Sequence, residues 1–390
     1  MEPEREIYLD NSATTKSTPE VNAAMLDTLE HCYGNPSSLH RLGMQAEKAF
    51  GAAKRTVAGL LGVTEGEVYI TSGGTESSNL AILGAAEANK RRGSHIICTG
   101  VEHPAVYETV KSLASRGFEV EFLGVDETGR ISLEEFEALL RSDTVLACVM
   151  HVNNETGAVM PVEALKPIMK KKSPHALLFV DAVQSFGKIA VKPAKWGVDL
   201  LSASAHKIHG PKGVGALYVK KGTRIVPVQF GGHQQGGLRS GTENVPGAVG
   251  FGAAAALAQQ HMKARYAHVR ELNHRLREGI ESNIDNVVFN SGDKDGESLP
   301  YILNISFLGI KAEILLHALE SKGIYVSTGS ACSSNAPAPS RTLLAMGKGK
   351  KEVEGAVRFS FSGDNTAEEI DYTVEALARA VAEIRKYVRG

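Results

Sequence analysis

Short apolar runs alternate with helix-forming stretches along most of this chain, and this alternation constrains the fold more than any other feature of the sequence. Strands are expected at 68–71, 95–98, 145–150, 176–180 and 215–219. Helical patterns lie between and after these runs, among them 134–141 and a long Ala-rich, charged stretch at 248–282. Strands and helices in alternation are the signature of an α/β fold.

The C-terminal third predicts a second, smaller unit. A strand at 302–307 and a helix at 312–322 precede a final helix with one apolar face, formed by Ile370, Val374, Leu377, Val381, Ile384 and Val388. With 390 residues, 43% of them apolar, the chain can bury one large core and one smaller core. We therefore expect a large domain at 16–260, and a small domain formed by 1–15 and 261–390.

Composition argues against several classes of partner. The 43 Lys and Arg residues nearly balance the 44 Asp and Glu residues, which does not favour a nucleic-acid or membrane surface. Residues 1–6 are mostly charged, and no apolar run approaches the roughly 18 residues of a transmembrane helix, so a cytoplasmic protein is expected. The four cysteines lack paired spacing, which indicates neither a disulfide framework nor a metal site.

Lys207 and Asp181 suggest a cofactor. Asp181 directly follows the apolar run at 176–180, and Lys207 lies in a Ser-Ala-His-Lys segment 26 positions later. Pyridoxal phosphate enzymes need a lysine that binds the aldehyde of the cofactor and a carboxylate that keeps its pyridine nitrogen protonated. A lysine in such a segment is more often a solvated loop residue, but ligands bind where strands of open α/β sheets end. The pair therefore favours pyridoxal phosphate.

A phosphate site is expected after the strand at 68–71. The segment 71–79 contains Gly73, Gly74 and Thr75 and opens a helical pattern, so its N–H groups can face an anion. An ordinary helix N-cap has the same composition, so the segment is consistent with either a phosphate site or a cap. Ser204 and His206 can supply further hydrogen-bond donors beside the lysine.

Three polar residues near strand ends are candidates for contacts with the cofactor ring. His103 follows the strand at 95–98 and can stack on the ring or act as an acid or base. Asn154 and Gln184 can approach the phenolate oxygen of the ring. The alternatives are an ordinary loop histidine beside a proline and amides that cap turns.

The chain resembles the cysteine desulfurases of the NifS and IscS group, which are fold type I pyridoxal phosphate enzymes. The resemblance runs through nearly the whole sequence in ordered motifs: Tyr8 to Thr15, Gly34 to Ser38, Gly73 to Ser77, the His103 turn, His151 to Gly157, Asp181 to Gln184, Ser204 to Pro211, Arg239 to Thr242, Ser330 to Cys332 and Val357 to Ser360. It implies a large domain with a mostly parallel seven-stranded sheet between helices and a smaller α+β domain.

The resemblance also implies roles for individual residues. Lys207 would bind the cofactor, Asp181 would pair with its ring nitrogen, and His103 would stack on the ring. Asn154 and Gln184 would approach the ring oxygen. The phosphate would be held by residues of the glycine turn, the lysine segment and a second subunit of a homodimer, namely Gly74, Thr75, Ser204, His206 and the second subunit's Thr242.

Cys332 and Arg358 decide which reaction is expected. The stretch around Cys332 is rich in Ser, Gly, Ala and Pro, which argues against burial, whereas Cys32, Cys98 and Cys148 fit small buried core residues. A thiolate at Cys332 can take the sulfur of bound L-cysteine as a persulfide, leaving alanine. Arg358 alternates with Val357 and Phe359 on a predicted strand and would grip the substrate carboxylate, with Asn35 as partner, unless it is merely solvated at a sheet edge.

Three functions are weighed. The leading one is cysteine desulfuration, with delivery of sulfur to an acceptor such as an iron–sulfur scaffold or a tRNA-thiolation protein. Selenocysteine lyase or another β-elimination would not need Cys332, and a non-catalytic sulfur-carrier or assembly partner would need neither Lys207 nor Asp181. The segment 335–340 departs from the Leu-Glu-Pro-Ser of many relatives, and the chain ends directly after its last helix, so the scaffold docking known for IscS is not implied.

Overall fold

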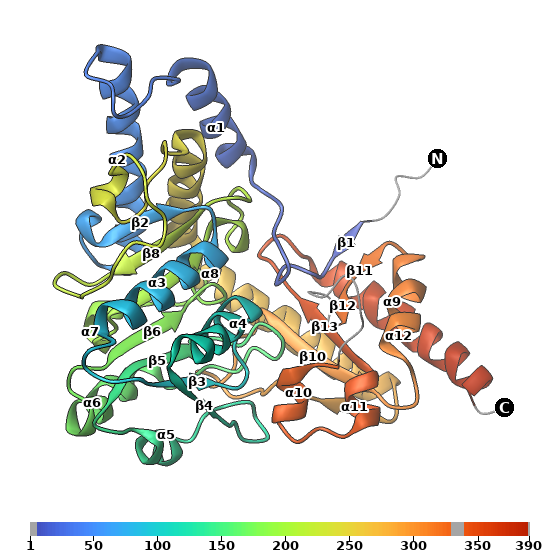
Figure 1. The fold of residues 1–390 in the computed structure, drawn as a ribbon. Coiled ribbons are helices and arrows are strands. Elements are labelled where there is room, and N and C mark those ends of the chain that lie inside the picture. Colours follow the sequence, from blue (N-terminus) through green and yellow to red (C-terminus); the bar gives the residue numbers. More distant parts are fainter. Residues whose placement is uncertain (1–5, 329–338, 389–390) are drawn as a thin grey trace.

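A seven-stranded sheet forms the largest part of the computed structural model, which describes residues 6–328 and 339–388 (Figure 1). Its strands, in spatial order, are β2 (Val68–Thr71), β8 (Gly215–Val219), β7 (Leu200–Ser204), β6 (Leu177–Asp181), β5 (Thr144–Met150), β3 (His95–Thr99) and β4 (Glu119–Leu123). Only β8 runs antiparallel to its neighbours, so the sheet is mostly parallel. Its strand residues are largely buried on both faces, which is typical of a sheet covered on both sides by helices.

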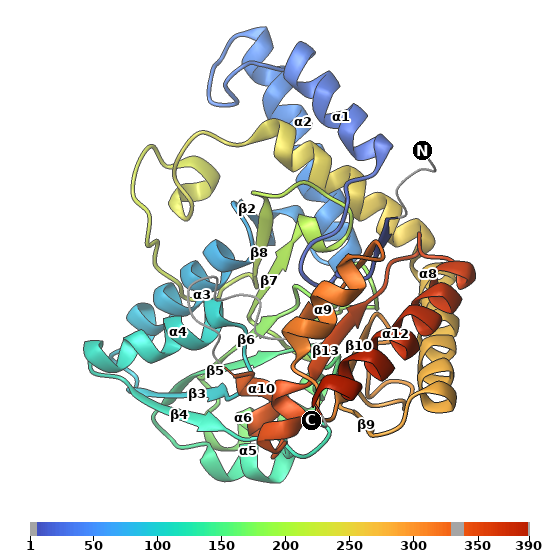
Figure 2. The same ribbon diagram turned by 90° about the vertical axis from the view of Figure 1, so that its right-hand side faces the viewer.

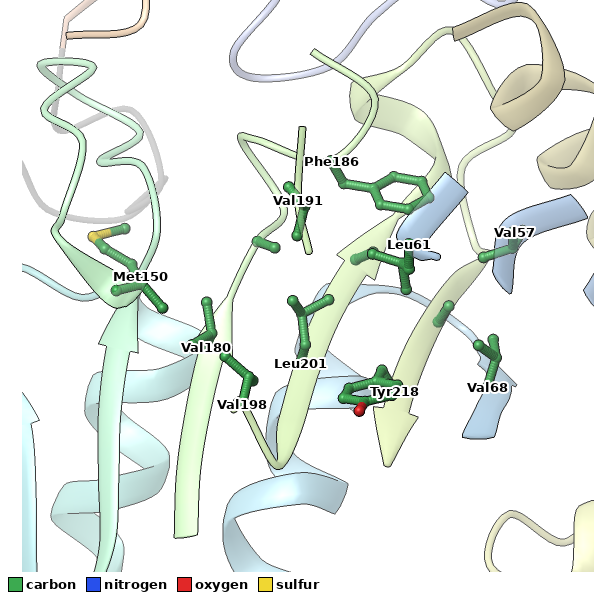
Figure 3. Close-up of a cluster of buried hydrophobic side chains, with 14 of the residues drawn as sticks. Val57, Leu61, Val68, Met150, Val180, Phe186, Val191, Val198, Leu201 and Tyr218 are labelled. Carbon is green, nitrogen blue, oxygen red and sulfur yellow. The ribbon is translucent and has the colours of Figure 1, made fainter. Parts of the chain in front are cut away.

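Helices cover the two faces of this sheet. On one side lie α3 (Gly74–Asn89) and α4 (Pro104–Ser112). The other side is covered by α2 (Arg41–Leu61), α5 (Leu133–Leu139), α6 (Val162–Lys172) and the first half of α8 (Val245–Asn283). Side chains from strands and helices form one buried cluster in this second layer, in which Leu61 of α2 lies near Leu201 of β7 (Figure 3). Short α7 (Pro193–Trp196) follows β6, and α1 (Pro19–His31) packs against α8.

A second core lies around a four-stranded antiparallel sheet, in the order β12 (Ser327–Thr328), β13 (Ala356–Ser360), β10 (Ile302–Phe307) and β9 (Val287–Phe289). Helices α9 (Ala312–Glu320) and α12 (Ala367–Val388) and the second half of α8 bury their apolar faces against it. Two short strands, β1 (Ile7–Tyr8) and β11 (Ile324–Tyr325), pair in parallel beside it. Helices α10 (Arg341–Ala345) and α11 (Lys350–Glu354) complete this part.

Helix α8 connects the two cores (Figures 1 and 2). It begins at Val245 with an Asn244 cap, whose side chain accepts a hydrogen bond from the Gly247 N–H at 3.0 Å. Its first half contributes Ala248 and Ala255 to the large core, and its second half contributes Leu272 to the small one. The expected domain boundary near residue 260 lies within this helix, and the division of the chain into two domains stays a prediction.

The structure confirms the α/β fold, and most expected elements agree with it to within a few residues. The helix expected at 134–141 already ends at Leu139, because Leu140 adopts extended backbone angles. Burial is confirmed for Cys98 and Cys148, but the prediction for Cys32 is wrong: it follows the end of α1 and is only partly buried. Within the described ranges, no helix is both long and apolar enough to cross a membrane.

Candidate active site

A pocket of about 250 Å³ opens at the carboxyl ends of the central strands. Strand β6 ends on Asp181 and the neighbouring β7 on Ser204, so the parallel register brings both to one edge of the sheet. Ten of the predicted site residues line the pocket: Gly74, Thr75, His103, Asn154, Asp181, Gln184, Ser204, His206, Lys207 and Arg358. Segments distant in the sequence complete the lining with Ser12, Ala13 and Ser327.

Lys207 reaches the pocket from the short turn after β7. Its Nζ donates hydrogen bonds to the backbone carbonyls of Ser12 and Ala13, the second at 2.8 Å. The N-terminal segment that supplies these carbonyls is fixed to β13, because the Ser12 N–H donates to Ser360 Oγ at 2.8 Å. The amine of Lys207 is therefore oriented by backbone oxygens of a turn that is hydrogen-bonded to the small sheet.

Asp181 is buried at the floor of the pocket. The Val183 N–H donates to its Oδ1 at 2.9 Å. Burial raises the pKa of Asp181, and the nearby His103, this N–H group and Lys207 oppose that shift. A buried carboxylate gains most from a cationic partner, so this position suits a protonated ring nitrogen.

The phosphate candidates meet at the N-terminus of α3. Gly73 precedes the helix with φ of 153°, a value suited to glycine, and no side chain caps the first turn. A Cβ on Gly74 would lie 2.8 Å from Val183 Cγ2, so only glycine fits there. Nearby, the buried hydroxyl of Ser204 has no hydrogen-bond partner among the described residues. An uncapped helix start beside an unsatisfied buried hydroxyl fits a phosphate.

His103 caps the N-terminus of α4 and lines the pocket wall. Its Nδ1 accepts a hydrogen bond from the Ala105 N–H at 3.1 Å. This acceptor role requires a lone pair on Nδ1, so the neutral ring carries its proton on Nε2. Burial lowers the pKa of His103, with Lys207 and Arg341 adding to the effect and Asp181 opposing it, which favours the neutral ring.

Arg358 enters from β13, an inner strand of the small sheet, and only 5% of the residue is exposed. The alternative of a solvated edge arginine is therefore wrong. Its Nη2 forms an ion pair with Asp10 Oδ1 at 2.8 Å, and its Nη1 donates to the Asn154 carbonyl at 2.9 Å. These contacts use two of the five N–H donors of the guanidinium, and Arg358 lines the pocket, so the side chain can still bind an anion there.

Two other predicted residues, Asn35 and Thr242, are not brought to this pocket. Asn35 is exposed, and its side-chain oxygen accepts from the Ser37 N–H at 2.9 Å. Thr242, expected to act in a second subunit, is also exposed and does not line the pocket of its own chain. Cys332 lies outside the described residues.

A polar network that the sequence did not predict surrounds part of the pocket. Glu102 is buried, and its Oε1 accepts from Thr99 Oγ1 and the Met150 N–H, both at 2.5 Å. Arg341 donates to the carbonyls of Gly100 and Glu102, and its guanidinium lies 3.7 Å from the centre of a tyrosine ring in α4. The position of Glu102 beside His103 was a possible signal, but nothing in the local sequence connects residue 341 to this turn.

The Asn154 turn is held to α10 in a similar way. The carboxylate of Glu155 is buried and accepts from Ser340 Oγ at 2.5 Å and from Thr342 Oγ1 at 3.1 Å. Burial raises the pKa of Glu155, and these two hydrogen bonds partly offset the shift. The turns that follow β3 and β5 are thus both anchored to the segment that begins α10.

These residues together fit pyridoxal phosphate. The anion site at α3, the buried carboxylate of Asp181 and the amine of Lys207 meet the three chemical requirements of that cofactor, namely its phosphate, its ring nitrogen and its aldehyde. All three contribute to the lining of one pocket.

Comparison with known proteins agrees with this assignment. Residues 7–373 match the family model described as Aminotransferase class-V. A cysteine desulfurase IscS of Clostridium botulinum is 40% identical over 382 residues, which cover 98% of this chain and 96% of that protein. A solved NifS-like protein is 39% identical with a TM-score of 0.91, covering 97% of this chain and all of its own.

A second solved structure, described as SspA in complex with cysteine, is 32% identical with a TM-score of 0.79 and covers 92% of this chain and 100% of that chain. These similarities extend over nearly the entire sequence. The chain therefore belongs to the class-V aminotransferase family, among its cysteine desulfurases of the IscS and NifS type.

Proposed function

We propose that this protein is a pyridoxal phosphate-dependent cysteine desulfurase, which converts L-cysteine to L-alanine and carries the released sulfur as a persulfide on Cys332. One observation carries the proposal: Lys207, Asp181 and Arg358 converge on a single pocket in a chain whose relatives are cysteine desulfurases. A lysine, a carboxylate and an arginine at one site supply a cofactor attachment point, a ring partner and a carboxylate receptor.

Pyridoxal phosphate supplies, when bound, an electron-withdrawing ring that makes the Cα–H of a bound amino acid acidic. Lys207 is the group that would hold and move this proton, since its amine is held at the pocket by the Ser12 and Ala13 carbonyls. Asp181 would keep the ring nitrogen protonated. His103, neutral with its proton on Nε2, is the group that would exchange a proton with the sulfur of the substrate.

Arg358 would bind the substrate carboxylate. Its Nε is buried without an acceptor, and its ion pair with Asp10 fixes the plane of the guanidinium. That a structural relative was solved in complex with cysteine supports L-cysteine as the substrate. Asn35, which lies outside the pocket in this chain, would have to approach from elsewhere to assist.

Cys332 is connected to the pocket through the chain itself. Ser327 lines the pocket, and Cys332 follows five positions later, so the two Cα atoms can be at most about 17 Å apart. Attack of a Cys332 thiolate on the substrate sulfur breaks the C–S bond and forms an S–S bond, and the substrate carbon takes up a proton to give alanine. The persulfide would then pass to a protein thiol such as that of an iron–sulfur scaffold.

We extend the proposal to a cytoplasmic homodimer. The exposed position of Thr242 supports its assignment to the phosphate site of a second subunit. Cys32, Cys98 and Cys148 are free, which suits the reducing cytoplasm where a free thiol at residue 332 would also persist.

The test is the product ratio from L-cysteine with the purified, cofactor-loaded protein and excess reducing thiol. Alanine and sulfide in equal amounts, in catalytic excess over the protein, are expected. Sulfide with pyruvate in place of alanine would assign β-elimination, and turnover of selenocysteine alone would assign a lyase. The absence of any product from a protein that has bound the cofactor would contradict the proposal.

A further inference from the structure

A second buried lysine lies behind the pocket. Lys188 is 6% exposed and follows Gln184 by four positions in the turn after β6. Its Nζ donates to Gln184 Oε1 at 3.1 Å and lies 5.5 Å from the centre of the Tyr301 ring. A buried lysine is costly unless a partner compensates its desolvation, and the amide oxygen and the ring are the contacts that the described residues supply.

Lys188 and the Ser12 carbonyl together determine which way the Gln184 amide points. A lysine amine that hydrogen-bonds here as a donor must face the amide oxygen, so Nε2 is turned to the opposite side. There Nε2 donates to the Ser12 carbonyl at 2.9 Å. The same carbonyl accepts the hydrogen bond of Lys207, so the two lysines are connected through one amide and one carbonyl.

The second N–H of Gln184 Nε2 is the group that can contact an acceptor in the pocket. An amide nitrogen carries two N–H bonds, of which Ser12 uses one. Because Gln184 lines the pocket, the second N–H is available to an acceptor there. Without Lys188 only the contact with the Ser12 carbonyl would oppose a half-turn of the amide, which would present its oxygen to the pocket and repel an anionic acceptor.

We propose that Lys188 is a positioning residue that makes Gln184 a hydrogen-bond donor toward the oxygen of the bound cofactor ring. This inference rests on the proposed function, to which it adds the residue that sets the polarity of the ring contact. Burial, with Lys207 and Arg358 adding to the effect, lowers the pKa of Lys188 to about 7, and below that pH the amine is an ammonium group that can only donate.

The test uses the absorption spectrum of bound pyridoxal phosphate and the affinity of the cofactor-free protein for it, both measured without cysteine. We expect Lys188→Met to change the ratio of the near-ultraviolet and visible bands and to weaken cofactor binding about tenfold, as for the loss of one buried hydrogen bond. Lys188→Gln, which keeps an N–H donor, should retain the wild-type spectrum. Lys192→Met, at an exposed lysine nearby in the sequence, is the control and should change nothing.

A double-mutant cycle with Gln184→Leu separates positioning from a general structural effect. If Lys188 acts through Gln184, Lys188→Met adds less than about twofold on the Gln184→Leu background. An undiminished effect on that background, or a wild-type spectrum in Lys188→Met, would overturn the inference. Lys188→Ala replaces Lys188→Met if the latter does not fold. The spectrum and the cofactor affinity are measured without cysteine, so they test the role of Lys188 alone. Failure of the desulfurase proposal would be seen only in the product assay with L-cysteine.

Discussion

The cofactor side and the substrate side of the pocket are built in different ways. The cofactor side consists of Gly74, Thr75, Asp181, Ser204, His206 and Lys207, all located in or directly after strands of the large sheet. The substrate side has Arg358 from the small sheet, while its expected partner Asn35 is exposed away from the pocket. Strand register thus brings most of the cofactor side together within one chain, with Thr242 as the group expected from a second subunit, whereas the substrate side depends on other segments.

This difference suits the different tasks of the two sides, namely holding the cofactor and contacting the substrate. Strand ends in a buried sheet are rigid, which suits a cofactor that stays in place through many turnovers. Groups that must contact a substrate, release a product and hand sulfur to another protein benefit from attachment outside the sheet. Variants on the two sides should therefore fail in different ways, and each prediction below tests that separation.

The largest effect is expected at Cys332. Cys332→Ser removes the sulfur acceptor, so formation of sulfide and alanine from L-cysteine should fall by about a thousandfold or more. The absorption spectrum of the bound cofactor should stay unchanged, since the cofactor side is intact. Cys32→Ser, at a partly buried cysteine directly after α1, is the matched control. Retained turnover in Cys332→Ser would favour β-elimination.

A second prediction concerns the stability of the cofactor side as a function of pH. Burial, with Asp181 adding to it, raises the pKa of Glu102 to about 8. The protonated form of Glu102 therefore contributes its full stabilisation to the fold at pH values below the ordinary carboxyl pKa of 4.5. This contribution is lost as the pH rises through about 8. Glu102→Gln mimics the protonated acid and should remove that loss, which we expect to be on the order of 2 kcal/mol.

Denaturant unfolding of the cofactor-free protein between pH 5 and 9 measures this contribution. The wild type should lose more stability with rising pH than Glu102→Gln, and the two should be similar at the acid end. Glu135→Gln, at an exposed carboxylate of α5, should follow the wild type. Equal pH dependence in Glu102→Gln and the wild type would show that Glu102 is ionised in the folded protein.

The smallest effect is expected at Thr242. If its hydroxyl completes the phosphate site of a second subunit, Thr242→Ala should weaken cofactor binding about tenfold in the dimer, as for one hydrogen bond to a charged group. Thr242→Ser should restore it. The measurement is equilibrium binding of pyridoxal phosphate to the wild type and both variants. Sedimentation establishes the oligomeric state of each. An unaffected affinity in a dimeric Thr242→Ala variant would argue that each chain binds the phosphate alone.

The sequence already determined the fold class and the cofactor side. An apolar run that ends on a polar residue specifies both a buried strand and the group at its carboxyl end, so Asp181 could be assigned before any coordinates were known. Ser204 was a candidate only because it precedes Lys207, and the strand that ends on it was not predicted. Periodicity likewise placed Arg358 opposite Val357 and Phe359, and the structure puts the latter two in the small core. Local patterns suffice where the function of a residue follows from the element that carries it.

Only the tertiary structure decided the contacts between segments. The Ser12 carbonyl that orients Lys207, the Asp10 carboxylate that pairs with Arg358 and the Lys188 amine behind Gln184 all involve partners that no local pattern connects. These contacts form because the two sheets and the connecting helix α8 place segments that are distant in the sequence next to one another. The sequence therefore identified the candidate groups, and the packing of the two cores set their orientation, because the contacts that orient each group come from residues remote in the chain.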